Sequence, residues 1–228
     1  MILRTVVAPL LGATCSVLVD DAGRCVVVDP GGGVAAEVLA LVAAEGWTPL
    51  AMLATHGHVD HTWSAAELGD AWDVPLHLHA DDEYRLDAPF ATLGPLGPQL
   101  GAMSGLAEPL RPARVETFSA GPDGTAALRL GSERAGWIEL TALHVPGHTQ
   151  GSTVYLVDAP APTALTGDVL FAGTIGRTDL PGGDQRSMMI SLTRLARLAP
   201  GTIVVPGHGP SSTIADELAT NPYLRAAR

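Results

Sequence analysis

The sequence contains no lysine, so all 13 of its basic residues are arginine, and 24 acidic residues bring the formal net charge to −11. With so few cations, the chain offers no basic surface that could neutralise a phosphate backbone, and nucleic acid is excluded as an expected partner. Charged residues make up only 16% of the chain and hydrophobic residues 46%, which excludes an intrinsically disordered chain.

Long apolar runs are also absent. A membrane-spanning helix needs about 18 consecutive apolar residues, and the chain contains no uninterrupted run of that length. The apolar segment at residues 1–19 resembles a signal peptide, but Pro9 and Gly12 interrupt it and no small-residue cleavage site follows. The length suits one domain over residues 1–228. We therefore expect a single-domain, cytoplasmic protein without a membrane partner, either a monomer or a homodimer.

Only two cysteines are present, Cys15 and Cys25, in segments that resemble the arms of a hairpin. A turn about residue 22 would pair Cys25 with roughly Val19 and leave Cys15 about four residues out of register, on the order of 13 Å away at about 3.3 Å per residue. A disulfide needs Cα atoms within about 7 Å. We therefore predict two free thiols, as is typical of a reducing cytoplasm.

One stretch stands out among what is present: residues 55–61, with the sequence THGHVDH, directly after an apolar run that predicts a buried strand. In an extended segment, residues two apart point the same way, so His56 and His58 can reach one ion. Asp60 and His61 cannot join them without a turn, and they suit a second position beside the first. A single histidine is usually structural, so the prediction depends on partners elsewhere.

Further glycine-flanked histidines and aspartates follow other predicted strands. They are His148 after residues 137–145, Asp168 after residues 162–166, and His208 after residues 202–205. Strand ends of one sheet layer converge in space, and a neighbouring glycine frees the backbone for the turn that a ligand needs. The combined set of nitrogen and carboxylate ligands, without thiolate, suits Zn, Fe or Mn.

Asp29 ends another apolar strand and is followed by Pro30 and three glycines. Its carboxylate is either a turn-former or a group that orients the metal loop from behind, and the sequence leaves both open. Residues 75–79 predict a strand with His77 and His79 on one face. Because no acidic or histidine neighbour joins them at a useful spacing, we predict that both are structural.

Helical periodicity predicts a helix over residues 34–45 and a later one that packs Met188, Leu192 and Leu195 on the sheet. Strand patterns also occur at residues 115–118 and 126–130. Residues 86–112 are rich in Gly and Pro and are interpreted as a lid, a binding loop or an unrecognised helix.

These motifs resemble those of the metallo-β-lactamase superfamily, and most closely the short, single-domain form of its glyoxalase II (hydroxyacylglutathione hydrolase) branch. Residues 55–61 match the T-H-x-H-x-D-H signature. Similar segments lie at residues 147–152, 167–173, 176–184, 206–209 and 221–224. The resemblance covers nearly the whole chain except residues 86–112.

The resemblance implies an α/β fold, an αββα sandwich with a metal site at one edge of the sheets, and two divalent metal ions, with zinc expected first and iron or manganese as alternatives. His56, His58 and His148 would hold one ion, and Asp60, His61 and His208 the other. Asp168 would bridge the two, and Asp60 and Asp168 would be the catalytic carboxylates.

The implied activity is hydrolysis of a 2-hydroxyacyl thioester of a small thiol, such as S-lactoylglutathione, by a metal-bound hydroxide. A thiol has a pKa of about 8.5, so a thiolate leaves without a strong general acid, and Asp60 would at most shuttle protons. Arg177 would bind a substrate carboxylate, or else pair with Asp179 or Asp184. Only 20 residues follow His208, so the helical region that helps bind glutathione in long forms is not expected, and the thiol carrier is open.

Three other activities fit the same motifs. A persulfide dioxygenase would bind one iron through His56, His148 and Asp168, and it would consume oxygen. A lactone or β-lactam hydrolase would use the same metals on a cyclic substrate. A metal-stabilised binding module without turnover is the alternative outside the enzymes.

Overall fold

Two six-stranded sheets form the centre of the computed structural model, which describes residues 1–104, 109–159 and 161–227. The first sheet has the order β1 (Ile2–Val7), β2 (Thr14–Val19), β3 (Arg24–Val28), β4 (Thr48–Leu53), β5 (Leu76–His79) and β6 (Val115–Phe118). The strands β1 to β3 are antiparallel, whereas β3 to β6 are parallel. The carboxyl ends of β3, β4 and β5 therefore meet at one edge of the sheet.

The second sheet has the order β14-β13-β10-β9-β8-β7. Its strands are β7 (Thr125–Ser132), β8 (Gly136–His144), β9 (Thr153–Ala159), β10 (Ala161–Gly167), β13 (Ile203–Pro206) and β14 (Ser212–Thr213), and β11 (Leu170–Phe171) with β12 (Thr174–Ile175) forms a separate ribbon. Strands β10 and β13 run parallel, so the loops that follow them also lie side by side.

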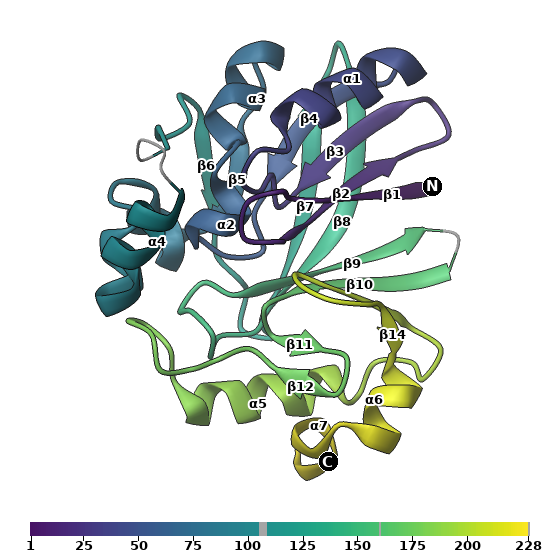
Figure 1. Cartoon of the computed structure of the whole chain (residues 1–228). Coiled ribbons are helices and arrows are strands. Elements are labelled where there is room, and N and C mark those ends of the chain that lie inside the picture. Colours follow the sequence, from purple (N-terminus) through teal and green to yellow (C-terminus); the bar gives the residue numbers. More distant parts are fainter. Residues whose placement is uncertain (105–108, 160, 228) are drawn as a thin grey trace.

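Helices cover the outer face of each sheet (Figure 1). The helices of the described residues are α1 (Ala35–Glu45), α2 (Val59–Thr62), α3 (Ala65–Trp72), α4 (Gly97–Ser104), α5 (Gln185–Leu195), α6 (Ile214–Thr220) and α7 (Pro222–Ala226), with 3-10 helices η1 (Ala80–Leu86) and η2 (Ala91–Leu96). In Figure 1, α1 and α3 lie on the first sheet, and α5, α6 and α7 lie beside the second.

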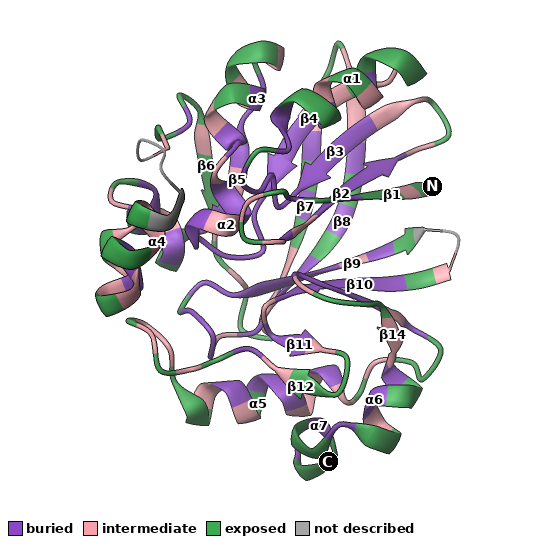
Figure 2. Ribbon diagram, viewed as in Figure 1, coloured by how far each residue is buried: buried purple, intermediate pink, exposed green. Residues whose placement is uncertain are grey.

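Three buried apolar clusters correspond to the three interfaces of a four-layer sandwich. One joins Val38 and Val42 of α1 to the first sheet, and a second fills the space between the sheets, with Leu53 and Tyr155 among its members. The third packs α5 on the second sheet. Buried residues follow the strands and the inner helix faces in Figure 2. The predicted αββα sandwich is therefore confirmed.

Several local predictions are confirmed as well. The helix predicted over residues 34–45 is α1, and it ends at Gly46, whose φ of 66° is left-handed. Cys25 pairs with Val19 across β2 and β3, and both cysteines are free and buried. Met188, which α5 carries, is also buried. Within the described residues, no helix combines the length and apolar character needed to span a bilayer.

Residues 86–112 contain short helices that periodicity did not reveal. They include the end of η1, all of η2 and all of α4, while residues 105–108 lie outside the described part of the chain. The pattern was weak because η2 carries Pro95 and a kink at Gly94, where φ is 57°. Of the three interpretations offered, an unrecognised helix describes this segment.

Candidate metal centre

The 55–61 segment begins just after β4 ends at Leu53 and turns into the short helix α2. His58 is the extended residue that precedes the helix, with φ −68° and ψ 148°. Helix α2 supplies the turn that the sequence requires for Asp60 and His61. The two parts of the segment can therefore present ligands to two adjacent positions.

The first group of side chains comprises His56, His58 and His148. His58 Nδ1 lies 3.1 Å from His56 Nε2 and 3.0 Å from His148 Nε2. A tetrahedral ion with metal–nitrogen bonds of about 2.0–2.1 Å would separate its ligand nitrogens by about 3.3 Å. All three rings are buried. The first group therefore has nearly the spacing of three ligands to one ion.

The second group comprises Asp60, His61 and His208, whose candidate ligand atoms lie within 4.8 Å of one another. His208 Nε2 lies 3.2 Å from Asp60 Oδ2, and His61 Nε2 lies 3.6 Å from the same oxygen. This group has nitrogen and carboxylate ligands, and His208 reaches it from the loop after β13.

Asp168 lies between the two groups. Its Oδ1 is 3.3 Å from His61 Nε2 of the second group, and its Oδ2 is 3.7 Å from His148 Nε2 of the first. The position suits a carboxylate shared by two ions. The structure thus brings all seven residues into one cluster, which we call the metal cluster: His56, His58, Asp60, His61, His148, Asp168 and His208.

Several polar atoms of the metal cluster have no partner in the protein. Among the described residues, four buried side-chain polar atoms lack a hydrogen bond, and three of them are His58 Nε2, His61 Nε2 and Asp168 Oδ1. An unsatisfied buried polar group costs about 1–3 kcal/mol. A bound cation between His61 and Asp168 would satisfy two of the three. The donor set therefore fits divalent metal ions.

Two histidines of the first group, His56 and His58, are held neutral. Burial, together with His148, lowers the pKa of His58 to about 3. Burial and the neighbouring His61 and His148 hold the pKa of His56 well below its ordinary value. A neutral imidazole is the form that binds a metal. The first group is thus prepared for an ion at neutral pH.

The carboxylates are held ionised. Burial alone would raise the pKa of Asp60 and Asp168, but the surrounding histidines, His61 foremost, together lower the pKa of both. Burial would lower the pKa of His61, but Asp60 and Asp168 raise it well above its ordinary value. The His61 proton therefore occupies a position that favours a positive charge, and a metal ion would replace it.

Asp29 lies behind the metal cluster and fixes two of its members. Its Oδ2 is 3.0 Å from His61 Nδ1. It also accepts hydrogen bonds from the Thr55 amide and hydroxyl at 2.6 and 2.8 Å, and the Thr55 hydroxyl lies 3.2 Å from His56 Nδ1. Asp29 has a φ of 54°, so it also makes a turn. Asp29 therefore both forms a turn and contacts the metal loop from behind, which are the two roles that the sequence left open.

Arg177 contacts the metal cluster through its backbone. The His148 Nδ1 hydrogen is donated to the Arg177 carbonyl oxygen at 2.8 Å, which leaves Nε2 for an ion. The guanidinium donates two hydrogen bonds to Asp179, at 2.7 and 2.8 Å, on the exposed surface. This is the ion pair that the sequence offered as the alternative to substrate binding. A contact of Arg177 with substrate stays a prediction.

His79 has neighbours that the sequence spacing concealed. Its ring stacks on His144 with centroids 3.9 Å apart, and Asp81 completes a group of candidate ligands. The expectation that no acidic or histidine residue joins His79 is therefore wrong. His144 could not be found from sequence spacing, because β5 and β8 belong to different sheets. His79 Nδ1 already accepts the Asp81 amide and His144 Nε2 donates to the Gln150 carbonyl, which favours a structural role.

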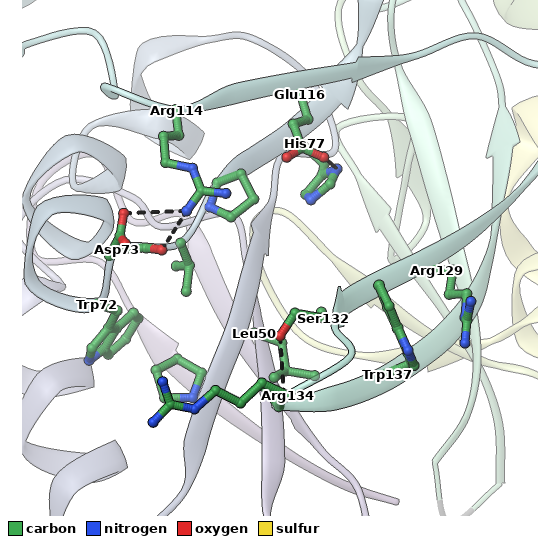
Figure 3. Close-up of a pocket in the computed structure, with 15 residues that line it drawn as sticks. Leu50, Trp72, Asp73, His77, Arg114, Glu116, Arg129, Ser132, Arg134 and Trp137 are labelled. Carbon is green, nitrogen blue, oxygen red and sulfur yellow. Dashed lines mark hydrogen bonds and ion pairs between the residues drawn. The ribbon is translucent and has the colours of Figure 1, made fainter.

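A separate hollow of about 570 Å³ lies at the amino ends of β4 and β5 (Figure 3). Arg114, Arg129 and Arg134 lie around it, together with Trp72 and Trp137. The metal cluster follows the carboxyl end of β4 instead, and none of its seven residues lines this hollow. The hollow is therefore separate from the candidate metal site, which is identified by the geometry of its ligands.

The chain matches a family model described as Metallo-beta-lactamase superfamily over residues 9–208. It is similar to "Probable metallo-hydrolase YqgX" of Bacillus subtilis, with 34% identity and coverage of 97% of this chain and 96% of the relative. It is also similar to "Hydroxyacylglutathione hydrolase GloC" of Haemophilus influenzae, with 30% identity and coverage of 93% and 92%.

Two solved structures share the fold over almost their full length. One is BLEG-1 B3 metallo-beta-lactamase, with a TM-score of 0.82, 31% identity and coverage of 98% of this chain and 99% of that one. The other is TTHA1623 in a di-iron-bound form, with a TM-score of 0.77, 34% identity and coverage of 96% and 99%.

Proposed function

Because the chain belongs to the metallo-β-lactamase superfamily, we propose that it is a metal-dependent hydrolase that cleaves a 2-hydroxyacyl thioester of a small thiol. Two divalent ions, with zinc preferred over iron or manganese, would be its cofactors. The relative described as a hydroxyacylglutathione hydrolase supports the substrate class, and the similar protein in a di-iron-bound form supports the number of metals.

The two groups of ligands would divide the two ions between them. His56, His58 and His148 would hold one ion, the second group the other, and Asp168 would lie between them. When bound, two divalent ions lower the pKa of a water molecule toward neutrality and polarise an acyl oxygen. Asp60 Oδ2, which lies 3.2 Å from His208 Nε2, would at most shuttle a proton within the site.

One observation carries the choice of substrate class. The carboxyl groups inside the metal cluster, Asp60 and Asp168, both have lowered pKa values and are ionised at neutral pH. Neither therefore carries a proton for the leaving group at the start of the reaction. A thiolate leaves without protonation, since the thiol has a pKa of about 8.5, whereas an amide nitrogen leaves poorly as an anion. The site therefore favours a thioester over an amide substrate.

Hydrolysis of a lactone or β-lactam is the second candidate, because the chain is 31% identical to a B3 metallo-beta-lactamase. The same ions would act on a cyclic acyl group. A persulfide dioxygenase needs only His56, His148 and Asp168. The complete second group favours a two-metal hydrolase over this mononuclear reaction.

The test is the rate of S-lactoylglutathione hydrolysis by metal-loaded protein, with a chelated sample as control. We expect turnover that is lost on chelation and restored by adding back the metal. A β-lactam and a lactone are assayed in parallel, and oxygen uptake is followed with a persulfide substrate. Two bound metals without thioester turnover would contradict the thioester proposal, and oxygen consumption with one bound iron would support the dioxygenase instead.

A further inference from the structure

Asp82 and Arg85 form an ion pair beside the metal cluster that is removed completely from solvent. Arg85 Nε lies 3.1 Å from Asp82 Oδ1, and both side chains are 0% exposed. Both residues belong to η1, directly after β5. Desolvating two charges is costly unless further hydrogen bonds satisfy them. The partners of this pair therefore show which parts of the protein it holds together.

The Asp82 carboxylate joins the two loops that carry the first group. Its Oδ2 accepts the Gly57 amide at 2.8 Å and the Thr149 hydroxyl at 2.7 Å. Its Oδ1 accepts the Gly151 amide at 3.0 Å. Gly57 separates the two histidines of the first loop, and Thr149 directly follows the histidine of the second. One buried carboxylate thus determines how closely these loops approach each other.

Arg85 extends the connection to a third loop. Its Nη2 donates to Gln150 Oε1 at 2.8 Å and to the Pro181 carbonyl at 2.9 Å. Pro181 belongs to the 176–184 loop, whose Arg177 carbonyl orients the third histidine of the first group. The two loops that carry the first group, and the 176–184 loop that orients His148, therefore all bond to this one ion pair.

Glycines permit these close contacts. A Cβ atom at Gly57 would lie 2.7 Å from the Asp82 carbonyl oxygen, and one at Gly151 would lie 2.7 Å from the Asp82 carboxyl carbon. A Cβ atom at Gly182 would approach Arg85 Nη2 to 2.4 Å. Gly57 and Gly151 do not have positive φ. Space for the ion pair, and not an unusual backbone turn, requires glycine at these two positions.

We propose that Asp82 and Arg85 are positioning residues that set the metal affinity of the first group without touching the ion or the substrate. The inference rests on the proposed metal centre. Within the described residues, no hydrogen bond joins the pair to the second group, which Asp29 orients through His61. Disrupting the pair therefore weakens one of the two ion sites selectively.

The experiment compares Asp82→Asn with wild type, using metal analysis after competition with a graded chelator. The amide keeps the shape but places an N–H₂ donor against donors of Gly57 or Gly151. We expect the first ion to bind roughly 10-fold more weakly or worse, which is the usual cost of losing an outer partner of a ligand. The second ion stays bound, so the metal content falls toward one per chain.

Asp20→Asn is the matched control. Asp20 also accepts two backbone amides, from Ala22 and Arg24, and a hydrogen bond from Arg24 Nε, but in the turn between β2 and β3 at the other end of the fold. We expect Asp20→Asn to bind both ions with wild-type affinity, and equal metal loss in the two variants would overturn the proposal.

Thr149→Val tests the same connection if Asp82→Asn fails to fold, because it removes one hydroxyl donor and preserves the shape of the side chain. We expect a weaker first site, and wild-type affinity in either folded variant overturns the proposal. Failure of the proposed function is recognised separately: wild type would bind two ions but hydrolyse no thioester, while the metal analysis of the variants would still decide the role of Asp82.

Discussion

His58 Nδ1 lies 3.0 Å from His148 Nε2, although 90 positions separate the two residues in the chain. His58 follows a strand of the first sheet and His148 follows a strand of the second. An ion shared by these residues would therefore link the two sheets. This contact explains why metal content, stability and activity should change together.

Removal of the metals should lower the melting temperature. An ion that binds only the folded state stabilises it by about 2.7 kcal/mol when its free concentration is 100 times its Kd. We expect a lower melting temperature after chelation and recovery after adding zinc, followed by circular dichroism. An unchanged melting temperature in protein shown by elemental analysis to be metal-free would contradict the link between the sheets.

Asp168→Asn should abolish turnover and reduce the metal content. Asp168 lies between His61 of the second group and His148 of the first. The asparagine amide carries no charge, so it cannot bridge two ions there as a carboxylate can. Elemental analysis and the S-lactoylglutathione assay measure the two effects. Full activity together with two ions per chain would show that Asp168 is not the bridging ligand.

Gly207→Ala should impair the second ion site. A Cβ atom at this position would lie 2.2 Å from Asp168 Oδ1 and 2.7 Å from His61 Cε1, so Asp168 must move. Gly201→Ala is the control, because a Cβ atom there meets nothing within 4 Å. We expect lower metal content and activity only in Gly207→Ala, and equal behaviour of the two variants would argue against tight packing at Asp168.

Arg177→Ala should leave the fold and the metal content intact. The ion pair with Asp179 is exposed, and such pairs contribute about 0–1 kcal/mol. The contact with His148 uses the Arg177 carbonyl, which alanine keeps. If the guanidinium also binds a substrate carboxylate, KM rises while kcat changes little. Asp179→Asn, which frees the guanidinium, is the comparison, and an unchanged KM in Arg177→Ala would exclude the contact with substrate.

The two cysteines should be unreactive in the native protein. Burial, with a smaller contribution from Asp20, raises the pKa of Cys25 to about 12, and burial likewise raises the pKa of Cys15. Unfolded thiols have a pKa of about 8.5. The contribution to stability is therefore complete below pH of about 8.5 and is lost as the pH rises toward 12, because the unfolded state ionises first.

Two measurements check the prediction on the thiols. A thiol reagent at pH 8 should modify neither cysteine in the native protein and both after denaturation. Urea titrations should give a lower free energy of unfolding at pH 10 than at pH 8. Rapid modification of the native protein would contradict the prediction.

The sequence determined the local structure and the candidate ligands. The 3.6-residue period predicted α1, the hairpin geometry predicted the pairing of Val19 with Cys25, and the 55–61 segment named four ligands. These features depend on residues close together in the chain, where backbone geometry converts spacing into position. The resemblance to a known family then supplied the layered fold, which the structure confirms.

Only the tertiary structure decided which distant residues meet. It placed Asp82 on the amides of Gly57 and Gly151, and His79 against His144. Asp82 follows a strand end as the ligands do, but no glycine flanks it, so nothing in its sequence context distinguishes it from an ordinary turn residue. The contacts of Asp82 with Gly151 and of His79 with His144 connect the two sheets, and their geometry depends on how the sheets pack. Spacing along a single chain carries no information about that packing.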